Sequence, residues 1–213
     1  MARASRLSLV LRALALLVLA LLVAGCGSKH RTLQQTAASK RCPVLGKQVS
    51  FPLLNPANTY KVTVQTSLGT FAFTLDVKDS PCTTSSFAHL ARQHFFDGLI
   101  FHRIVPGFVI QGGDPNGNGT GGPGYTVVDT PPTDAKYVRG VVAMAKTGTE
   151  PAGTSGSQFF VVTGADAGLP PDYALLGKVT RGLDVVERIG RLGNPQNEQP
   201  TRRVVMRHVT VSP

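Results

Sequence analysis

The chain has 213 residues, of which 42% are apolar and 16% are charged. This length accommodates one domain of ordinary size or two small ones, and the composition excludes both a disordered chain and a protein with many membrane spans. The formal net charge of +10 at pH 7 suggests nucleic acid or an anionic surface as a partner, although charge alone does not identify one. With 23 glycines and 15 prolines, the composition favours short strands joined by tight turns over a helical bundle.

Residues 1–25 are typical of a bacterial lipoprotein signal peptide. Three arginines precede an apolar run over residues 13–24, which Gly25 and Cys26 follow. The run is too short for a membrane-spanning helix, which needs about 20 residues. We expect cleavage before Cys26 and lipidation of this cysteine, so that the protein is secreted and lipid-anchored to the outer face of the bacterial cell membrane. An ordinary signal peptide with a chance cysteine and an uncleaved anchor are the alternatives.

Residues 26–58 are predicted to contain the lipidated cysteine and a flexible tether. The segment is polar at first and then rich in proline, and it shows no sustained helical or strand period. We expect the positively charged side chains of this segment to be solvated, as in a linker. Attraction of these charges to anionic lipid headgroups is the alternative. A location outside the cytoplasm argues against nucleic acid as a partner.

A β-hairpin is the first predicted element of the folded domain. Residues 60–66 and 70–75 alternate between apolar and polar side chains and flank the turn Ser67-Leu68-Gly69. This alternation places Phe71 and Phe73 in the core. Further strands are expected over residues 99–103, 108–111, 138–145, 158–163, 174–180 and 203–211.

Two helices are predicted among these strands. Asp79 or Ser80 supplies a cap and Pro81 a first-turn residue for a helix that ends before Gly98. The second helix is short and covers residues 183–191. Because antiparallel strands outnumber helices, the pattern indicates a barrel or sandwich with a few helices.

Several sequence motifs of known catalytic or binding sites are absent from the sequence or occur in an unsuitable context. Residues 119–124 fit the spacing G-x-G-x-x-G, but no helix can begin in a run so rich in glycine, so we expect a loop. The motifs H-E-x-x-H, C-x-x-C and G-x-S-x-G do not occur. We therefore expect neither a metal site nor a cofactor.

The most informative segment is the run FHRIVPGFVIQGGD over residues 101–114. Short adjacent strands with this alternation allow Arg103 and Gln111 to share a face with Phe108. By itself the pattern also fits a strand arginine whose stem packs on the protein and whose charged head lies in water.

This run, together with Ala145 and the sequence GSQFF at residues 156–160, resembles the cyclophilin family of peptidyl-prolyl cis-trans isomerases. The resemblance extends over roughly residues 60–211. It implies a mainly β fold for a domain over residues 59–213, namely a closed eight-stranded antiparallel β-barrel capped by two α-helices.

The resemblance also implies roles for individual residues. The catalytic group would be Arg103, with Gln111 as its polar neighbour and Phe108 beside it. The substrate-binding residues would be His102, Val109, Ala145, Phe160, Leu169 and Tyr173.

The sequence departs from the family pattern at three of its positions. Val109 stands where the family usually has methionine, Gly168 stands where cyclosporin-sensitive members have tryptophan, and Tyr173 stands where many members have histidine.

The activity that follows is acceleration of the rotation of Xaa-Pro bonds in extracytoplasmic proteins, which assists their folding. The expected partners are proline-containing polypeptides and the membrane, and the expected oligomeric state is a monomer. A holdase or scaffold module that binds proline segments with little turnover is the alternative.

A disulfide between Cys42 and Cys82 is expected as well. These are the only two cysteines left once Cys26 is acylated, and an oxidising exterior permits the bond. Two unpaired thiols are the alternative, since the sequence gives no distance between the two Cα atoms.

Overall fold

The computed structural model describes residues 42–213. The signal peptide over residues 1–25, the lipidated Cys26 and the first part of the tether lie outside the described residues. In the described part of the chain, no helix is long and apolar enough to cross a membrane. The helices are α2 (Pro81–Arg92) and α3 (Leu183–Gly190). The strands are β1 (Leu45–Gly46), β2 (Lys61–Thr66), β3 (Gly69–Leu75), β4 (Phe101–Val105), β5 (Val109–Gly112), β6 (Tyr125–Val128), β7 (Val141–Met144), β8 (Thr154–Ser155), β9 (Phe159–Val162), β10 (Leu175–Arg181) and β11 (Met206–Ser212).

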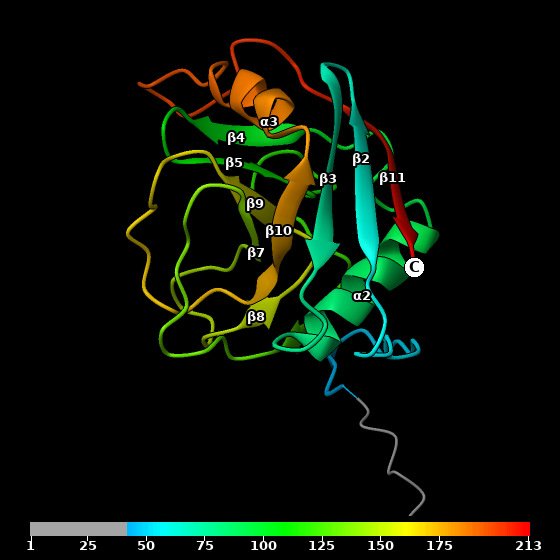
Figure 1. Ribbon diagram of the computed structural model, residues 1–213. Coiled ribbons are helices and arrows are strands. Elements are labelled where there is room, and N and C mark those ends of the chain that lie inside the picture. The colour runs from blue at the N-terminus through cyan, green and yellow to red at the C-terminus, as the bar shows by residue number, and fades with distance from the viewer. Residues whose placement is uncertain (1–41) are drawn as a thin grey trace, which may run out of the picture. The chain divides into compact units, whose positions relative to one another are not determined.

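Eight strands form one curled antiparallel sheet in the order β11-β2-β3-β10-β7-β9-β5-β4 (Figure 1). The predicted hairpin is confirmed, because β2 pairs with β3 in a register that sets Thr66 opposite Gly69. At the two edges of this sheet, next to β4 and β11, a bridge joins Ile100 to Val205, and backbone hydrogen bonds link residues 98–101 to residues 204–206. The sheet forms a half-barrel whose two edges approach each other at these contacts, and the fully closed barrel that we expected is not shown.

The main core fills the concave side of this sheet. Phe71 and Phe73 of β3 are buried, as their alternation predicted, and these two residues and Phe87 of α2 are each no more than 1% exposed. The ring of Phe87 packs against the rings of Phe73 and Phe159 at centroid distances of 5.9 and 5.7 Å. The helices α2 and α3 lie at opposite ends of the sheet (Figure 1).

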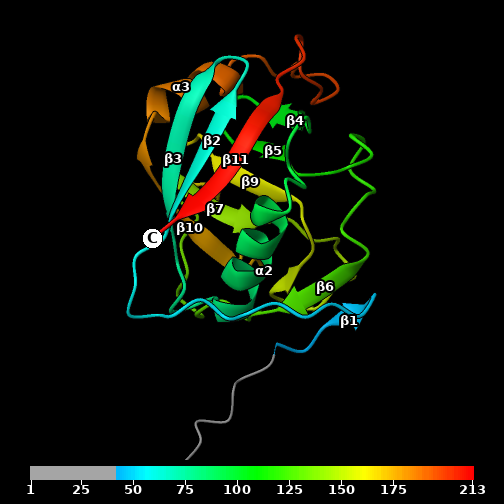
Figure 2. The ribbon, with the colours of Figure 1, turned by 90° about the vertical axis from the view of Figure 1, so that its right-hand side faces the viewer.

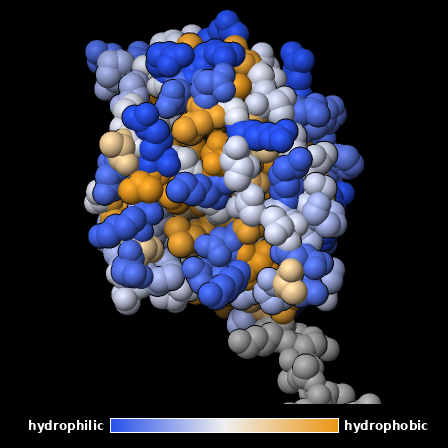
Figure 3. All heavy atoms as spheres, in the orientation of Figure 1, coloured by the Kyte–Doolittle hydropathy of each residue, from blue (hydrophilic) through white to orange (hydrophobic). Residues whose placement is uncertain are grey.

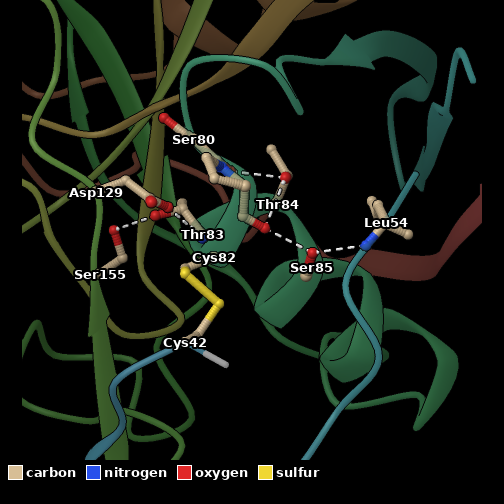
Figure 4. Close-up of a disulfide and its surroundings, with 10 residues drawn as sticks. Cys42, Leu54, Ser80, Cys82, Thr83, Thr84, Ser85, Asp129 and Ser155 are labelled. Atoms are coloured by element: carbon tan, nitrogen blue, oxygen red, sulfur yellow. Dashed lines mark hydrogen bonds between the residues drawn. A yellow bond between two sulfur atoms is a disulfide. The ribbon is translucent and has the colours of Figure 1, made fainter. Parts of the chain in front are cut away.

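Helix α2 begins at Pro81, as predicted, but its cap has a different source. Ser80 occupies the N-cap position without making a side-chain capping bond. Instead, Oδ2 of Asp129 accepts the N–H of Thr83 at 2.6 Å (Figure 4). Burial raises the pKa of the Asp129 carboxyl, and hydrogen bonds from Thr83 partly offset this rise. The cap thus comes from a residue distant in sequence, which no local pattern indicates.

Residues 42–58 pack against the domain, so the predicted flexible tether is wrong for this part of the segment. β1 pairs with β6 to extend a small three-stranded sheet (Figure 2). Leu54 is 6% exposed, and its N–H donates to Oγ of Ser85 at 2.9 Å (Figure 4). A disulfide joins Cys42 to Cys82 of α2, the pair expected from the sequence, with 5.4 Å between the Cα atoms. These contacts offset the conformational entropy that the segment loses when it becomes ordered.

Candidate active site

Four adjacent strands present one row of side chains on the face of the sheet opposite to the main core. Arg103 of β4 lies opposite Gln111 of β5, which lies opposite Phe160 of β9. Phe160 lies in turn opposite Ala143 of β7. Because directly opposed residues of antiparallel strands share a face, the four side chains form a continuous row. The alternate residue Ile110 belongs to the main core.

An apolar cluster, distinct from the main core, covers this face beside Arg103. Its buried members are Val109, Tyr137, Val141, Ala143, Phe160 and Val162, and its partly buried members are Phe108, Val138, Ala145, Ala167, Leu169, Tyr173 and Leu175. The structure therefore brings together all of the apolar and aromatic residues expected to contact substrate. They come from β5 and β9, from the turn between β4 and β5, from the residue that follows β7, and from the segment between β9 and β10.

Arg103 lies at the edge of this apolar cluster. Its guanidinium carbon is 5.9 Å from the centroid of the Phe108 ring. One Nη donates to Oε1 of Gln111 at 3.4 Å, and Nε donates to Oε2 of Glu198 at 2.6 Å. The side chain is 34% exposed, so part of the cationic group faces solvent above the cluster.

A chain of amide hydrogen bonds extends from Arg103 to the glycine-rich loop. Nε2 of Gln111 donates to Oε1 of Gln158 at 3.0 Å. Nε2 of Gln158 then donates to the carbonyl oxygens of Gly119 and Gly121, each at 2.9 Å. These bonds fix the orientation of the Gln111 amide, so that its oxygen faces the guanidinium group.

Asp114 fixes the start of the glycine-rich loop. Its carboxylate accepts the N–H groups of Asn116 at 2.8 Å, of Asn118 at 2.9 Å and of Gly119. Burial raises the pKa of this carboxyl, but the three backbone hydrogen bonds outweigh burial and leave the pKa below its ordinary value. The charged form thus holds the loop, which contains neither helix nor strand over residues 119–124, as predicted.

His102 differs from the other predicted substrate contacts because it is not a member of the apolar cluster. Neither ring nitrogen has a hydrogen-bond partner among the described residues, although both are buried. Burial lowers the pKa of the imidazole; the charge of Asp114 opposes this shift and that of Arg103 adds to it. The ring is therefore neutral at pH 7. His102 precedes Arg103 in β4, and its ring lies near the loop that Asp114 holds.

The segment that departs from the family pattern closes one side of the cluster. The ring of Tyr173 packs edge-on against the rings of Phe160 and Tyr137, at centroid distances of 5.6 and 5.9 Å. The Tyr137 hydroxyl donates to the carbonyl of Tyr173 at 2.6 Å and accepts its N–H at 3.0 Å. Gly168 has a φ of 62°, and a Cβ built there would have no neighbouring atom within 4 Å. A side chain at this position would thus face open space, but on a backbone that favours glycine.

The family model described as cyclophilin type peptidyl-prolyl cis-trans isomerase/CLD matches residues 61–211. The chain belongs to this family. The match includes both helices and every residue to which the sequence assigned a catalytic or substrate-binding role. Among the residues that the structure describes, those numbered 42–60, which include Cys42 and β1, precede the match and lie outside the part of the cyclophilin that the family model describes.

Curated relatives and solved structures agree with this membership. Peptidyl-prolyl cis-trans isomerase B of Bacillus subtilis is 42% identical over 118 residues, 55% of this chain and 80% of the relative. Peptidyl-prolyl cis-trans isomerase A of Mycobacterium tuberculosis is 34% identical over 176 residues, 74% of this chain and 95% of the relative. A crystal structure of a cyclophilin-type isomerase from Cryptosporidium parvum superposes with a TM-score of 0.66 at 26% identity, covering 73% of this chain and 99% of that chain.

Three residues of the site were not assigned from the sequence. Glu198 contacts Arg103 from 95 positions away, in the loop between α3 and β11. Tyr137 is 1% exposed and holds Tyr173 from a loop with no periodic pattern. Gln158 is part of the sequence GSQFF, so its position in that motif was the one available signal. For Glu198 and Tyr137, no local pattern identifies a contact that only the fold creates.

Proposed function

We propose that this cyclophilin accelerates rotation about Xaa-Pro bonds of extracytoplasmic proteins and that Arg103 is its catalytic arginine. The observation that carries the proposal is the position of the guanidinium group at the edge of an apolar surface that includes Phe108, Val109 and Phe160. A proline ring can pack on this surface, and the adjoining cation then lies within reach of the peptide bond.

The chemistry requires no bond to break. Rotation of the amide must overcome a barrier of about 18 to 20 kcal/mol, because resonance is lost in the twisted state. In that state the proline nitrogen becomes pyramidal and basic, so a donor directed at it stabilises the transition state more than the planar ground state. Arg103 is such a donor, and its guanidinium group stays charged at physiological pH.

The hydrogen bonds of Arg103 leave donors for substrate. A guanidinium group has five N–H donors, and among the described residues Glu198 and Gln111 accept two of them. A rate enhancement of about 10⁵ corresponds to about 7 kcal/mol, whereas one charged hydrogen bond contributes about 1.5 to 3 kcal/mol. Anchoring of the proline ring on the apolar surface and exclusion of water therefore supply the remainder.

The proposal places this activity outside the cytoplasm, on a lipid anchor at Cys26, with Leu169 and Tyr173 among the substrate contacts. The disulfide between Cys42 and Cys82 supports an oxidising compartment. A monomer is expected. On the face that Figure 3 shows, apolar side chains reach the surface in patches separated by hydrophilic ones, which supports this expectation for that face.

The test is isomerisation of a short Xaa-Pro peptide by the full-length chain and by Arg103→Ala. We expect the substitution to lower kcat/KM by at least about tenfold while the protein stays folded, because the guanidinium lies at the surface and not in the core. Arg188→Ala, which removes an exposed ion pair with Asp184 on α3, is the matched control. An unchanged rate for Arg103→Ala would exclude this mechanism, and tight peptide binding without any turnover would favour the holdase.

A further inference from the structure

The described residues contain a pocket of about 980 Å³ next to the row of site residues. Gln111, Ala145 and Gln158 line one side of it and also belong to the site described above. The pocket is therefore continuous with the surface on which the proline would pack. An extended peptide advances about 3.3 Å per residue, so a side chain close to the proline reaches the pocket.

The wall of the pocket includes part of the segment that precedes the family match. Leu45 and Gly46 of β1 line it together with the glycine-rich loop. In β1, Leu45 pairs with Thr126, and the N–H of Lys47 donates to the carbonyl of Gly124 at 2.8 Å. Figure 2 shows β1 alongside β6 at this edge of the domain.

The position of β1 is fixed by its own sequence. Gly46 has a φ of 93°, and a Cβ built there would lie 2.7 Å from the carbonyl oxygen of Gly124, so only glycine permits this close approach. The disulfide at Cys42 holds the segment on one side of β1. On the other side, the ring of Phe51 packs against that of Tyr125 at a centroid distance of 6.3 Å. Leu45 is thus held in place at the pocket and does not belong to a loose tail.

Leu45 is also unusual in its exposure. It is 59% exposed, and among the residues that the structure describes only Leu53, at 37%, is a second exposed large hydrophobic side chain. An exposed leucine that a disulfide and a strand pairing hold at the rim of a pocket is suited to contact an apolar group.

We propose that Leu45 is a specificity-determining residue for substrate. It forms an apolar wall of the pocket and favours polypeptides that carry a large apolar side chain within a few residues of the proline. The inference rests on the proposed function, because the occupant of the pocket is the same chain whose proline packs beside Arg103.

The experiment measures the affinity of peptides for the full-length chain by fluorescence anisotropy. The peptides contain one proline and carry either leucine or glycine at each of the three positions on either side of it. For one of these positions we expect wild-type protein to bind the leucine peptide about tenfold more tightly than the glycine peptide. Leu45→Ser should reduce this ratio to about threefold or less.

Leu53→Ser is the matched control, because Leu53 is an exposed leucine of the same segment that does not line the pocket. It should keep the wild-type ratio. The inference is overturned if wild-type protein shows no preference for leucine at any position, if Leu45→Ser keeps the full preference, or if Leu53→Ser loses it equally. Isomerisation rates of the same peptides separate the two proposals. If the peptides are isomerised but Leu45→Ser keeps the wild-type preference for leucine, only the role of Leu45 is contradicted. If the preference depends on Leu45 but no peptide is isomerised, only the proposed function is contradicted.

Discussion

The contact between Glu198 and Arg103 combines an ion pair with an unusual backbone conformation. Glu198 has a φ of 60°, which costs a residue with a side chain about 1 to 2 kcal/mol. Its backbone carbonyl accepts the N–H of Ile104 at 2.8 Å, which holds the loop against β4. The geometry thus supports Glu198 as a positioning residue for the guanidinium group.

The first residue-scale prediction concerns Glu198→Gly. Glycine removes the backbone strain, and the lost ion pair is exposed, so the free energy of unfolding should change by less than about 1 kcal/mol. Without its Nε acceptor the guanidinium is less well oriented, and kcat/KM should fall by about threefold or more. Urea unfolding and peptide isomerisation measure the two quantities. Glu187→Gln, which breaks the Arg139 pair, is the control, and equal rates for the two variants would argue against positioning.

The second residue-scale prediction concerns His102. In the unfolded chain its imidazole binds a proton near pH 6.5, whereas burial lowers its pKa in the folded chain. Between these two values the unfolded state binds more protons, so stability is lost as the pH falls below about 6.5. His102→Phe should therefore show a smaller decrease in Tm between pH 7 and pH 5 than the wild-type protein. Equal decreases in the two proteins would assign the pH dependence to other groups. The lowered pKa of Asp114 acts below about pH 4, outside this window.

At the scale of elements, periodic segments were predictable and long-range contacts were not. The hairpin follows from alternation and α2 from Pro81. The run around Arg103 identified β4 and β5, and the sequence GSQFF identified β9, so three of the four strands that carry the site were marked by motifs. β6 and β8 were missed because they are short and pair within the small sheet. The order over residues 42–58 was missed because it depends on a disulfide and on the pairing of β1, neither of which produces a period in the sequence.

The element-scale prediction concerns the disulfide between Cys42 and Cys82, which fixes this segment to α2. The bond closes a loop with a sequence separation of 40, so reduction should lower the free energy of unfolding by up to about 4 kcal/mol. Denaturation in urea with and without a reductant measures the difference. Peptide mapping of the non-reduced protein should recover the linked peptide, and quantitative alkylation of both thiols without a reductant would refute the bond.

At the scale of the whole described domain, the curled sheet separates two apolar clusters by its two faces. The concave face holds the main core, and the opposite face carries the cluster beside Arg103. The row that contains Arg103, Gln111 and Phe160 therefore lies on hydrogen-bonded strands, and its geometry does not depend on loops alone. In the sequence, β1, which forms part of the pocket wall, comes shortly after the segment that connects Cys26 to Cys42.

The last prediction concerns how the molecule is attached. If cleavage precedes Cys26 and this cysteine is lipidated, wild-type protein should partition into the detergent phase and incorporate a labelled fatty acid, because two or more acyl chains suffice for stable membrane residence. Cys26→Ser should abolish both properties and leave peptide isomerisation unchanged. The 16 residue steps from Cys26 to Cys42 span at most about 55 Å, so an anchored domain would act on chains close to the membrane surface. Wild-type protein that is wholly soluble and begins at a residue other than Cys26 would contradict this attachment.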